Sequence, residues 1–181
     1  MKRLSAFAVF FVMAFCLVSC AVPVKSSSTS HTNGLDSTFE SAVTFTLEKM
    51  TAEGTLVRSG SGLWSVEFES PNTLSGVKLD FSDGEVSAFY KGLEFSVPQS
   101  ALPVKAMMLN LIKAVDDNAR LEKLSGEEKD GSFIVPGTLE GGDYQLGLDS
   151  DGRLVSFEMP NYKLSITLHD TSFSMVTEEQ T

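Results

Sequence analysis

The pattern of hydrophobic and polar positions has the period of strands along most of the chain and the period of a helix in one stretch. This arrangement predicts the architecture. From Phe39 to Leu168 hydrophobic residues mostly alternate with polar ones, which is the period of half-buried strands. Over residues 103–116 they recur instead at the i, i+3, i+4, i+7, i+8 spacing that forms one stripe of a helix. The sequence therefore predicts one amphipathic helix between two runs of strands. Its stripe consists of Val104, Met107, Met108, Leu111, Ile112 and Val115.

Local signals predict where this helix begins and ends. Pro103 suits a first helical turn, and the Asp-Asp-Asn run at 116–118 is a poor continuation. Two interpretations of the stripe remain open. It fills a core, as apolar stripes usually do, or it lids a cavity with a changing apolar occupant, because methionine adapts to irregular surfaces. Four polar side chains are expected to face away from the stripe: Lys105, Asn110, Lys113 and Asp116.

The runs of strands are punctuated by turn signals. Asp83-Gly84 and Asp151-Gly152 are strong signals for tight turns, and short strands joined by tight turns form an antiparallel sheet. The segment 119–124 fits either a strand or a helical tail, and 126–131 is expected to be a charged loop.

The expected sheet is wider than the helix is long. About ten strands spaced about 4.8 Å apart span over 40 Å, whereas the helix is only about 20 Å long. The sheet must therefore curl, and its inner side becomes a concave apolar surface. The fold class is α+β, mostly β, with a curved antiparallel sheet and the helix 103–116 covering its concave face. Bends or bulges are expected at Gly54, Gly62, Gly76 and Gly147.

The N-terminus indicates export and lipidation. Lys2 and Arg3 precede a short apolar run, which is typical of a signal peptide over residues 1–19. The sequence Leu17-Val18-Ser19-Cys20 resembles the lipobox of bacterial lipoproteins, so we expect an acyl anchor, such as palmitate, on Cys20. The expected order is a tether over 20–37, a folded domain over 38–175 and a tail over 176–181. The alternative, an ordinary apolar-run cysteine, describes Cys16 better than Cys20.

Cysteine content excludes one kind of cross-link, and net charge limits the classes of binding partner. Cleavage before Cys20 leaves it as the only cysteine, so an intramolecular disulfide is excluded. Loss of Lys2 and Arg3 takes the formal charge from −10 to −12, which repels phosphate backbones and anionic headgroups. We expect no nucleic-acid partner, a monomer, and a membrane contact through the lipid on the extracytoplasmic side.

Catalytic and metal-binding patterns are weak. The two histidines, His31 and His169, are far apart in the sequence, and the G-x-S-x-G nucleophile elbow is missing. Asp149 and Asp151 could hold calcium, but a hairpin turn explains them better because further ligands of a calcium loop are missing. We therefore expect no enzyme activity, no cofactor and no metal.

Several segments resemble the strands of the lipoprotein-carrier superfamily typified by LolA and LolB. The resemblance covers most of the chain after Thr38, although 34–41 is a poor match to the N-terminal helix of the family. It implies an unclosed β-barrel whose cavity holds acyl chains of lipids or lipoproteins, and it places Arg58 where the family has a functional strand arginine. The matching segments are Gly54-Thr55-Leu56-Val57-Arg58, Gly62-Leu63-Trp64 to Phe68 with Pro71, Leu79-Asp80-Phe81-Ser82-Asp83-Gly84, Gly152-Arg153-Leu154-Val155-Ser156-Phe157 and Tyr162 to Leu168.

Two functions follow as hypotheses. The first is an anchored, non-enzymatic carrier or acceptor that binds an acyl chain, lipid or lipoprotein in the apolar cavity, with Arg58 as a polar contact. The second is a surface structural or interaction lipoprotein with a filled core. The residues expected to contact the lipid are Trp64, Phe68, Phe81, Tyr90, Phe95, Met107, Met108, Leu111, Ile112 and Phe157.

Overall fold

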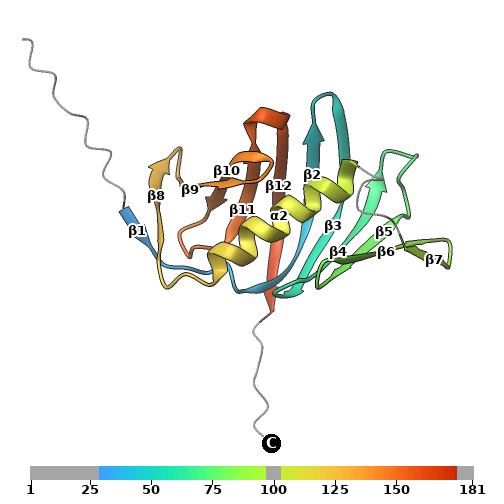
Figure 1. The fold of residues 1–181 in the computed structure, drawn as a ribbon, viewed down its shortest axis with the longest axis horizontal. Coiled ribbons are helices and arrows are strands. Elements are labelled where there is room, and N and C mark those ends of the chain that lie inside the picture. The colour runs from blue at the N-terminus through green and yellow to red at the C-terminus, as the bar shows by residue number, and fades with distance from the viewer. Residues whose placement is uncertain (1–28, 97–102, 175–181) are drawn as a thin grey trace, which may run out of the picture.

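The computed structural model describes residues 29–96 and 103–174, which form one antiparallel sheet and one long helix (Figure 1). The first strands are β1 (Thr29–His31), β2 (Thr38–Leu47), β3 (Met50–Gly60), β4 (Leu63–Ser70), β5 (Lys78–Ser82), β6 (Glu85–Tyr90) and β7 (Leu93–Ser96). After helix α2 (Pro103–Ala119) come β8 (Leu124–Lys129), β9 (Ser132–Leu139), β10 (Gly142–Leu148), β11 (Leu154–Met159), the 3-10 turn η1 (Pro160–Tyr162) and β12 (Leu164–Ser174).

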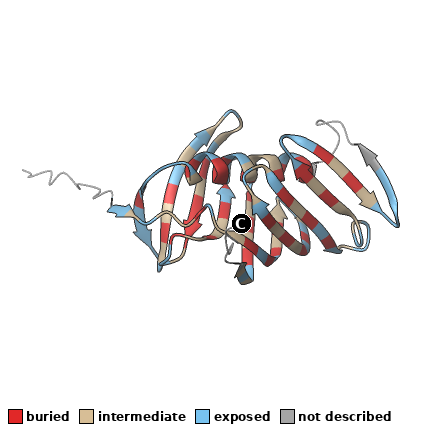
Figure 2. Ribbon diagram, turned by 90° about the horizontal axis from the view of Figure 1, so that it is seen from below, coloured by how far each residue is buried: buried red, intermediate tan, exposed pale blue. Residues whose placement is uncertain are grey.

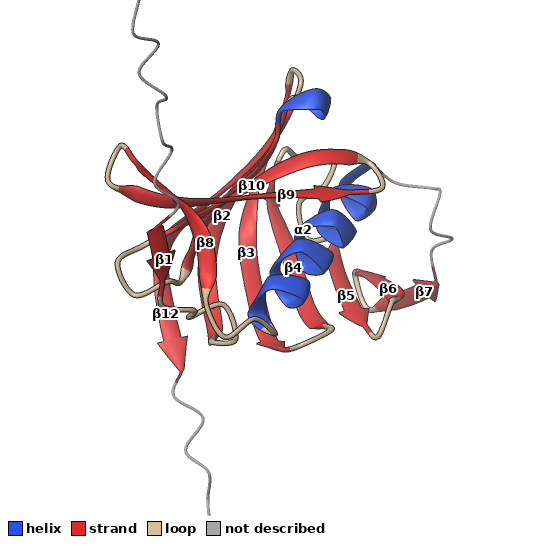
Figure 3. Cartoon of the chain, turned by 60° about the vertical axis from the view of Figure 1, so that its left-hand side comes forward, coloured by secondary structure: helices blue, strands red, loops and turns tan. Residues whose placement is uncertain are grey.

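Two meanders make up the sheet. Strands β2 to β7 follow one another on one side and β8 to β12 on the other, and the pairing of β12 with β2 joins them. The short β1 pairs with β8 at one edge, and β7 forms the other edge. The twelve strands therefore curve without closing into a barrel (Figure 3). This confirms the predicted fold class, in which one curved antiparallel sheet carries a helix on one face.

Alternation along each strand places its hydrophobic residues on the concave face. Buried and exposed positions alternate along the strands (Figure 2). Because neighbouring strands are in register, these residues form rows across the sheet. One fully buried row runs from β9 to β3 as Val135, Leu146, Phe157, Ile166, Phe45 and Ala52. A second runs from β12 to β6 as Phe173, Phe39, Arg58, Trp64, Phe81 and Val86.

Two of the four predicted glycines lie at irregularities of the strand register. The register shifts between Glu53 and Gly54 and between Gly147 and Leu148. A Cβ on Gly54 would lie 2.2 Å from the carbonyl oxygen of Glu67, and one on Gly147 would lie 2.2 Å from Ser156 Oγ. The close approach at Gly54 is to backbone and excludes a side chain, whereas at Gly147 the Ser156 hydroxyl would have to rotate away. Gly62 and Gly76 have positive φ angles of 71° and 80° and lie in turns instead.

Helix α2 crosses the concave face diagonally (Figures 1 and 3). It starts at Pro103, as predicted, but it continues to Ala119 instead of ending at residue 116. The expectation that Lys105 and Asp116 face away is wrong, because they are only 3% and 7% exposed. Asp116 turns inward because it has a buried cationic partner, described below. Lys113 is exposed, as expected.

Other boundaries also differ from the sequence-based expectation. Residues 126–129 belong to β8 instead of a charged loop, and only the turn at Asp130 and Gly131 follows it. The segment 119–124, expected to be a strand or a helical tail, is mostly neither. The helix ends at Ala119 and the next strand begins at Leu124.

The folded part begins before Thr38. Strand β1 pairs with β8, and Leu35 is only 2% exposed, although both lie within 20–37. The signal peptide, Cys20 and the tail over 176–181 lie outside the described residues. Within the described ranges, no helix has both the length and the apolar character needed to cross a membrane.

Candidate ligand-binding face

The residues predicted to contact a lipid divide into a buried and an exposed group. Tyr90 is 38% exposed, Ile112 is half-buried, and Phe95 belongs to β7 by its backbone while its side chain lies outside the described part. The other seven are at most 3% exposed and lie on the concave face or on the side of α2 that covers it: Trp64, Phe68, Phe81, Met107, Met108, Leu111 and Phe157.

Beneath α2 the concave face is filled by side chains. Met108 and Leu111 have no exposed surface. The rings of Phe45 and Phe68 contact each other with centroids 5.6 Å apart, and those of Tyr144 and Phe157 lie 6.0 Å apart. In this structure, α2 therefore packs directly on its part of the sheet and fills the core there, which is the first of the two interpretations of its apolar stripe.

Two surface hollows lie elsewhere. One, of about 450 Å³, is formed by β9, β10 and Pro160, and the other, of about 190 Å³, by residues of β8 to β11 and the turn at Asp130. Both include Gln145, which alternates with the buried Tyr144 and Leu146 and therefore faces away from the core. Neither hollow is lined by a residue of α2.

At the β6–β7 edge the apolar face continues into solvent. Ala88 is fully buried, and Tyr90 follows two positions later on the same face of β6. Tyr90 pairs with Leu93 of β7, which is 70% exposed. This is the open end of the concave face: Tyr90 and Leu93 extend its apolar surface beyond the buried core.

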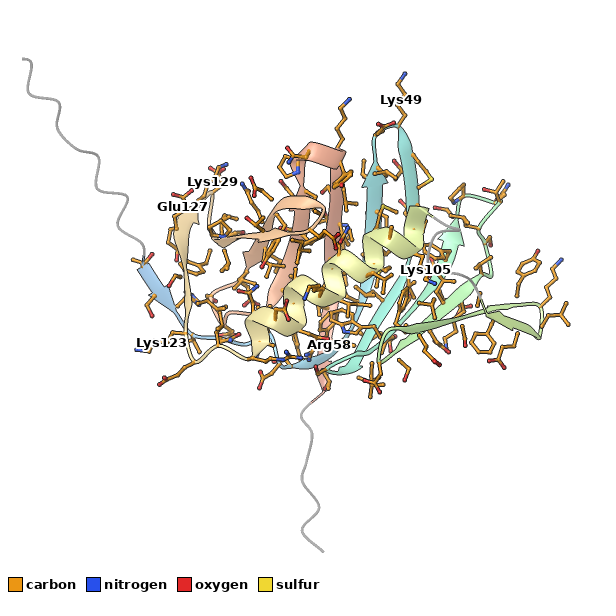
Figure 4. The ribbon with its side chains drawn as sticks, viewed as in Figure 1. Lys49, Arg58, Lys105, Lys123, Glu127 and Lys129 are labelled. Carbon is orange, nitrogen blue, oxygen red and sulfur yellow. The ribbon has the colours of Figure 1, made fainter. Side chains whose placement is uncertain are left out.

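A buried ion pair fastens the C-terminal half of α2 to β3. Arg58 lies beneath the C-terminal half of α2 (Figure 4). Its Nη2 donates to Asp116 Oδ1 at 3.1 Å, and its Nη1 donates to the carbonyl oxygens of Asp36 and Ser37 at 2.7 and 3.0 Å. The backbone N–H of Gly62 donates to Asp116 Oδ2 at 2.7 Å. Because both charges are buried and have several hydrogen bonds, we call Arg58 and Asp116 the latch.

Two asparagines complete this closed end. Asn118 Nδ2 donates to Tyr144 Oη at 2.7 Å, and the ring of Tyr144 lies where a Cβ on Gly137 would come within 2.3 Å of it. Asn33 Nδ2 donates to the carbonyl oxygens of Asn118 and Leu121 at 2.9 and 2.6 Å. The Asn118 carbonyl oxygen, which lies at the helix C-terminus, also accepts from the backbone N–H of Leu121 at 3.0 Å.

Arg58 was named from the sequence as a polar contact for the ligand, which stays a prediction, and its partner Asp116 was missed. The available signal was its phase, because Arg58 lies two residues after Leu56 and therefore faces the core, where a cation needs a carboxylate. Asp116, Asn118 and Tyr144 were not predicted as a group, since their proximity depends on how α2 crosses the sheet. Among the described residues, no three histidine, cysteine or carboxylate side chains gather as a metal site.

The geometry defines an open, curved antiparallel sheet with one helix fastened on its concave face. No family model and no curated protein matches the chain. Similar solved structures include an uncharacterized conserved protein from Thermus thermophilus, with a TM-score of 0.47, 15% identity, and coverage of 80% of this chain and 83% of that chain.

Two further structures have lower scores. A DUF1329 family protein from Desulfovibrio piger has a TM-score of 0.43 at 15% identity, covering 83% of this chain and 88% of that chain. A LolA superfamily protein from Nitrosomonas europaea has a TM-score of 0.38 at 9% identity, covering 80% and 89%. These likenesses concern the fold alone.

Proposed function

We propose that this protein is an extracytoplasmic lipoprotein, anchored through Cys20, that binds an acyl chain of a lipid or of another lipoprotein on its concave face. It is a carrier or an acceptor and does no chemistry on its ligand. One observation supports this most directly: the apolar concave face is larger than its helical cover. It ends in the exposed side chains of Tyr90 and Leu93.

The energetics of such a site do not require a polar motif. Each buried methylene contributes about 0.8 kcal/mol, so ten methylenes contribute about 8 kcal/mol before the costs of association. An acyl chain that enters at the open end would next meet the residues beneath α2. Met107 and Met108 suit this position because their side chains adapt to a changing neighbour.

The latch and the bond between Asn118 and Tyr144 hold the C-terminal half of α2. Met107, Met108 and Leu111 contribute apolar contacts further toward its N-terminus. An acyl chain would replace some of these apolar contacts while the C-terminal half stays in place.

Uptake of a pyrene-labelled acyl chain tests this proposal. In the full-length chain carrying Cys20→Ala, so that no anchor of its own competes, Met108→Glu should keep cooperative unfolding but lower uptake by about tenfold or more. If α2 can lift, the carboxylate reaches water in the free protein, and it then opposes the apolar ligand. Ala106→Glu is the matched control, because it adds the same charge at an exposed position of α2 and should leave uptake unchanged.

A surface interaction lipoprotein with a filled core is the second candidate. The complete burial of Met108 and Leu111 favours it. In that case Met108→Glu would unfold the protein, and the parent chain would take up no probe.

A further inference from the structure

Two buried N–H donors on the concave face have no hydrogen-bond partner within the part of the chain that the structure describes. They are Arg58 Nε and Trp64 Nε1. The residues are 2% and 3% exposed and face each other across β3 and β4, with the guanidinium carbon 5.5 Å from the centre of the indole ring. Two free donors therefore lie on paired residues of the apolar row that crosses β12 to β6.

Their protein surroundings explain why they stay free. The other nitrogens of the Arg58 guanidinium donate to Asp116 and to the carbonyls of Asp36 and Ser37. The neighbours in the row are Phe39 and Phe81, whose side chains hold no acceptor. A buried donor without an acceptor costs about 1–3 kcal/mol, and such groups are rare in folded proteins.

Charge restricts the group that could satisfy these donors. The positive charge of Arg58 is already balanced by Asp116 at 3.1 Å. A carboxylate added here would bring a net negative charge into a buried site, which is costly without a further cation. An uncharged carbonyl oxygen has two lone pairs, so it can accept hydrogen bonds here without adding a charge.

We propose that Arg58 Nε and Trp64 Nε1 bind the ester or amide carbonyl oxygen at the head of an acyl chain. This inference rests on the proposed function and deepens it. The ligand class is an acyl ester or amide, and the concave face discriminates against free fatty acids and plain hydrocarbons. The apolar row then holds the polar head of the ligand as well as part of its chain.

The single tryptophan makes the site directly observable. Trp64 is the only tryptophan of the chain, so its indole N–H gives one resonance in a ¹⁵N-labelled sample. The full-length chain with Cys20→Ala would be titrated with methyl palmitate, palmitate and hexadecane. We expect the indole proton to move downfield with the ester and to stay in place with the hydrocarbon, because only the ester supplies an acceptor.

Variants measure the contribution of the indole donor. Trp64→Phe keeps an aromatic ring but removes the N–H, so it should weaken ester binding by about threefold to tenfold, as one hydrogen bond would. Its hydrocarbon affinity should stay within about twofold. Phe81→Leu is the matched control in the same row, and it should lower both affinities by the same factor because no donor is lost.

The outcomes separate this inference from the proposed function. Equal binding of ester and hydrocarbon with an unmoved indole resonance would overturn the inference while acyl binding stands. An indole that is hydrogen-bonded without ligand and unchanged by ester would also overturn it, because a buried water would then satisfy the donor. Failure of all three probes to bind would contradict the proposed function itself. If Trp64→Phe does not fold, the resonance of the parent chain decides.

Discussion

The two ends of the concave face are built from different chemistry. At the closed end, α2 is joined to the sheet by charged and amide groups: the latch of Arg58 and Asp116, and the bonds of Asn118 and Asn33. At the open end, β6 and β7 present Tyr90 and Leu93 to solvent. One end is therefore specified by directional bonds and the other by exposed apolar surface.

Under the proposed function, this difference separates the rigid part of the fold from the part where a ligand enters. Hydrogen bonds have preferred directions, so the latch fixes where α2 ends on the sheet. Apolar contacts are not directional and can be exchanged for contacts with a ligand. Changes that break the latch or the asparagine bonds should therefore mainly alter stability, whereas changes at Tyr90 and Leu93 should alter binding and leave stability nearly unchanged.

The largest effect on stability is expected from breaking the latch. Asp116→Ala leaves Arg58 as a buried charge without its carboxylate, so it should lower the free energy of unfolding by about 3–5 kcal/mol in urea denaturation. The double variant Arg58→Leu with Asp116→Leu should lose much less, because no charge is left unpaired. A loss below about 1 kcal/mol for the single variant would mean that the latch does not hold α2.

A smaller loss is expected where Tyr144 crosses Gly137. Gly137→Ala places a Cβ against the Tyr144 ring, and overpacking of this kind should lower the free energy of unfolding by about 1–3 kcal/mol. The loss should shrink in a Tyr144→Leu background, which a double-mutant cycle measures. Gly141→Ala is the control, because its Cβ would lie 3.3 Å from Tyr162, an exposed side chain that can move. Equal losses for both glycines would contradict the closed-end packing.

The open end should show the opposite behaviour. Leu93→Ser should change the free energy of unfolding by no more than about 0.5 kcal/mol, because the side chain is 70% exposed. It should nevertheless reduce uptake of the pyrene-labelled acyl chain. Leu121→Ser provides the comparison, since Leu121 is 51% exposed but lies at the closed end. Matching uptake by the two variants would rule out ligand entry at β6 and β7.

Much of the fold could be predicted from the sequence, because most strands have one solvent-facing and one buried face. The alternation around Trp64 and Phe68 and the stripe from Val104 to Val115 each report burial locally. Strand β8 was missed because its residues, including Glu127 and Glu128, are polar on both faces. Strand β1 was missed because three residues are too few to show a period.

The closed end was less predictable because it depends on tertiary partners. Asp116 and Asn118 are poor helix formers in isolation, and this led to a helix that was three residues too short. In the fold, Arg58 and Tyr144 bond to these side chains, and the helix continues. The ion pair between Arg58 and Asp116 could not be predicted from the sequence, because β3 and α2 come together only in the folded, curved sheet.

Native mass spectrometry of the protein, extracted with detergent and then freed of it, tests acyl binding most directly. We predict a bound mass of an acyl ester or amide in addition to the lipid that we propose for Cys20, reduced on Leu93→Ser and retained on Leu121→Ser. A clean mass with no added lipid, together with no uptake of the pyrene-labelled chain, would contradict the proposal that the concave face holds a ligand.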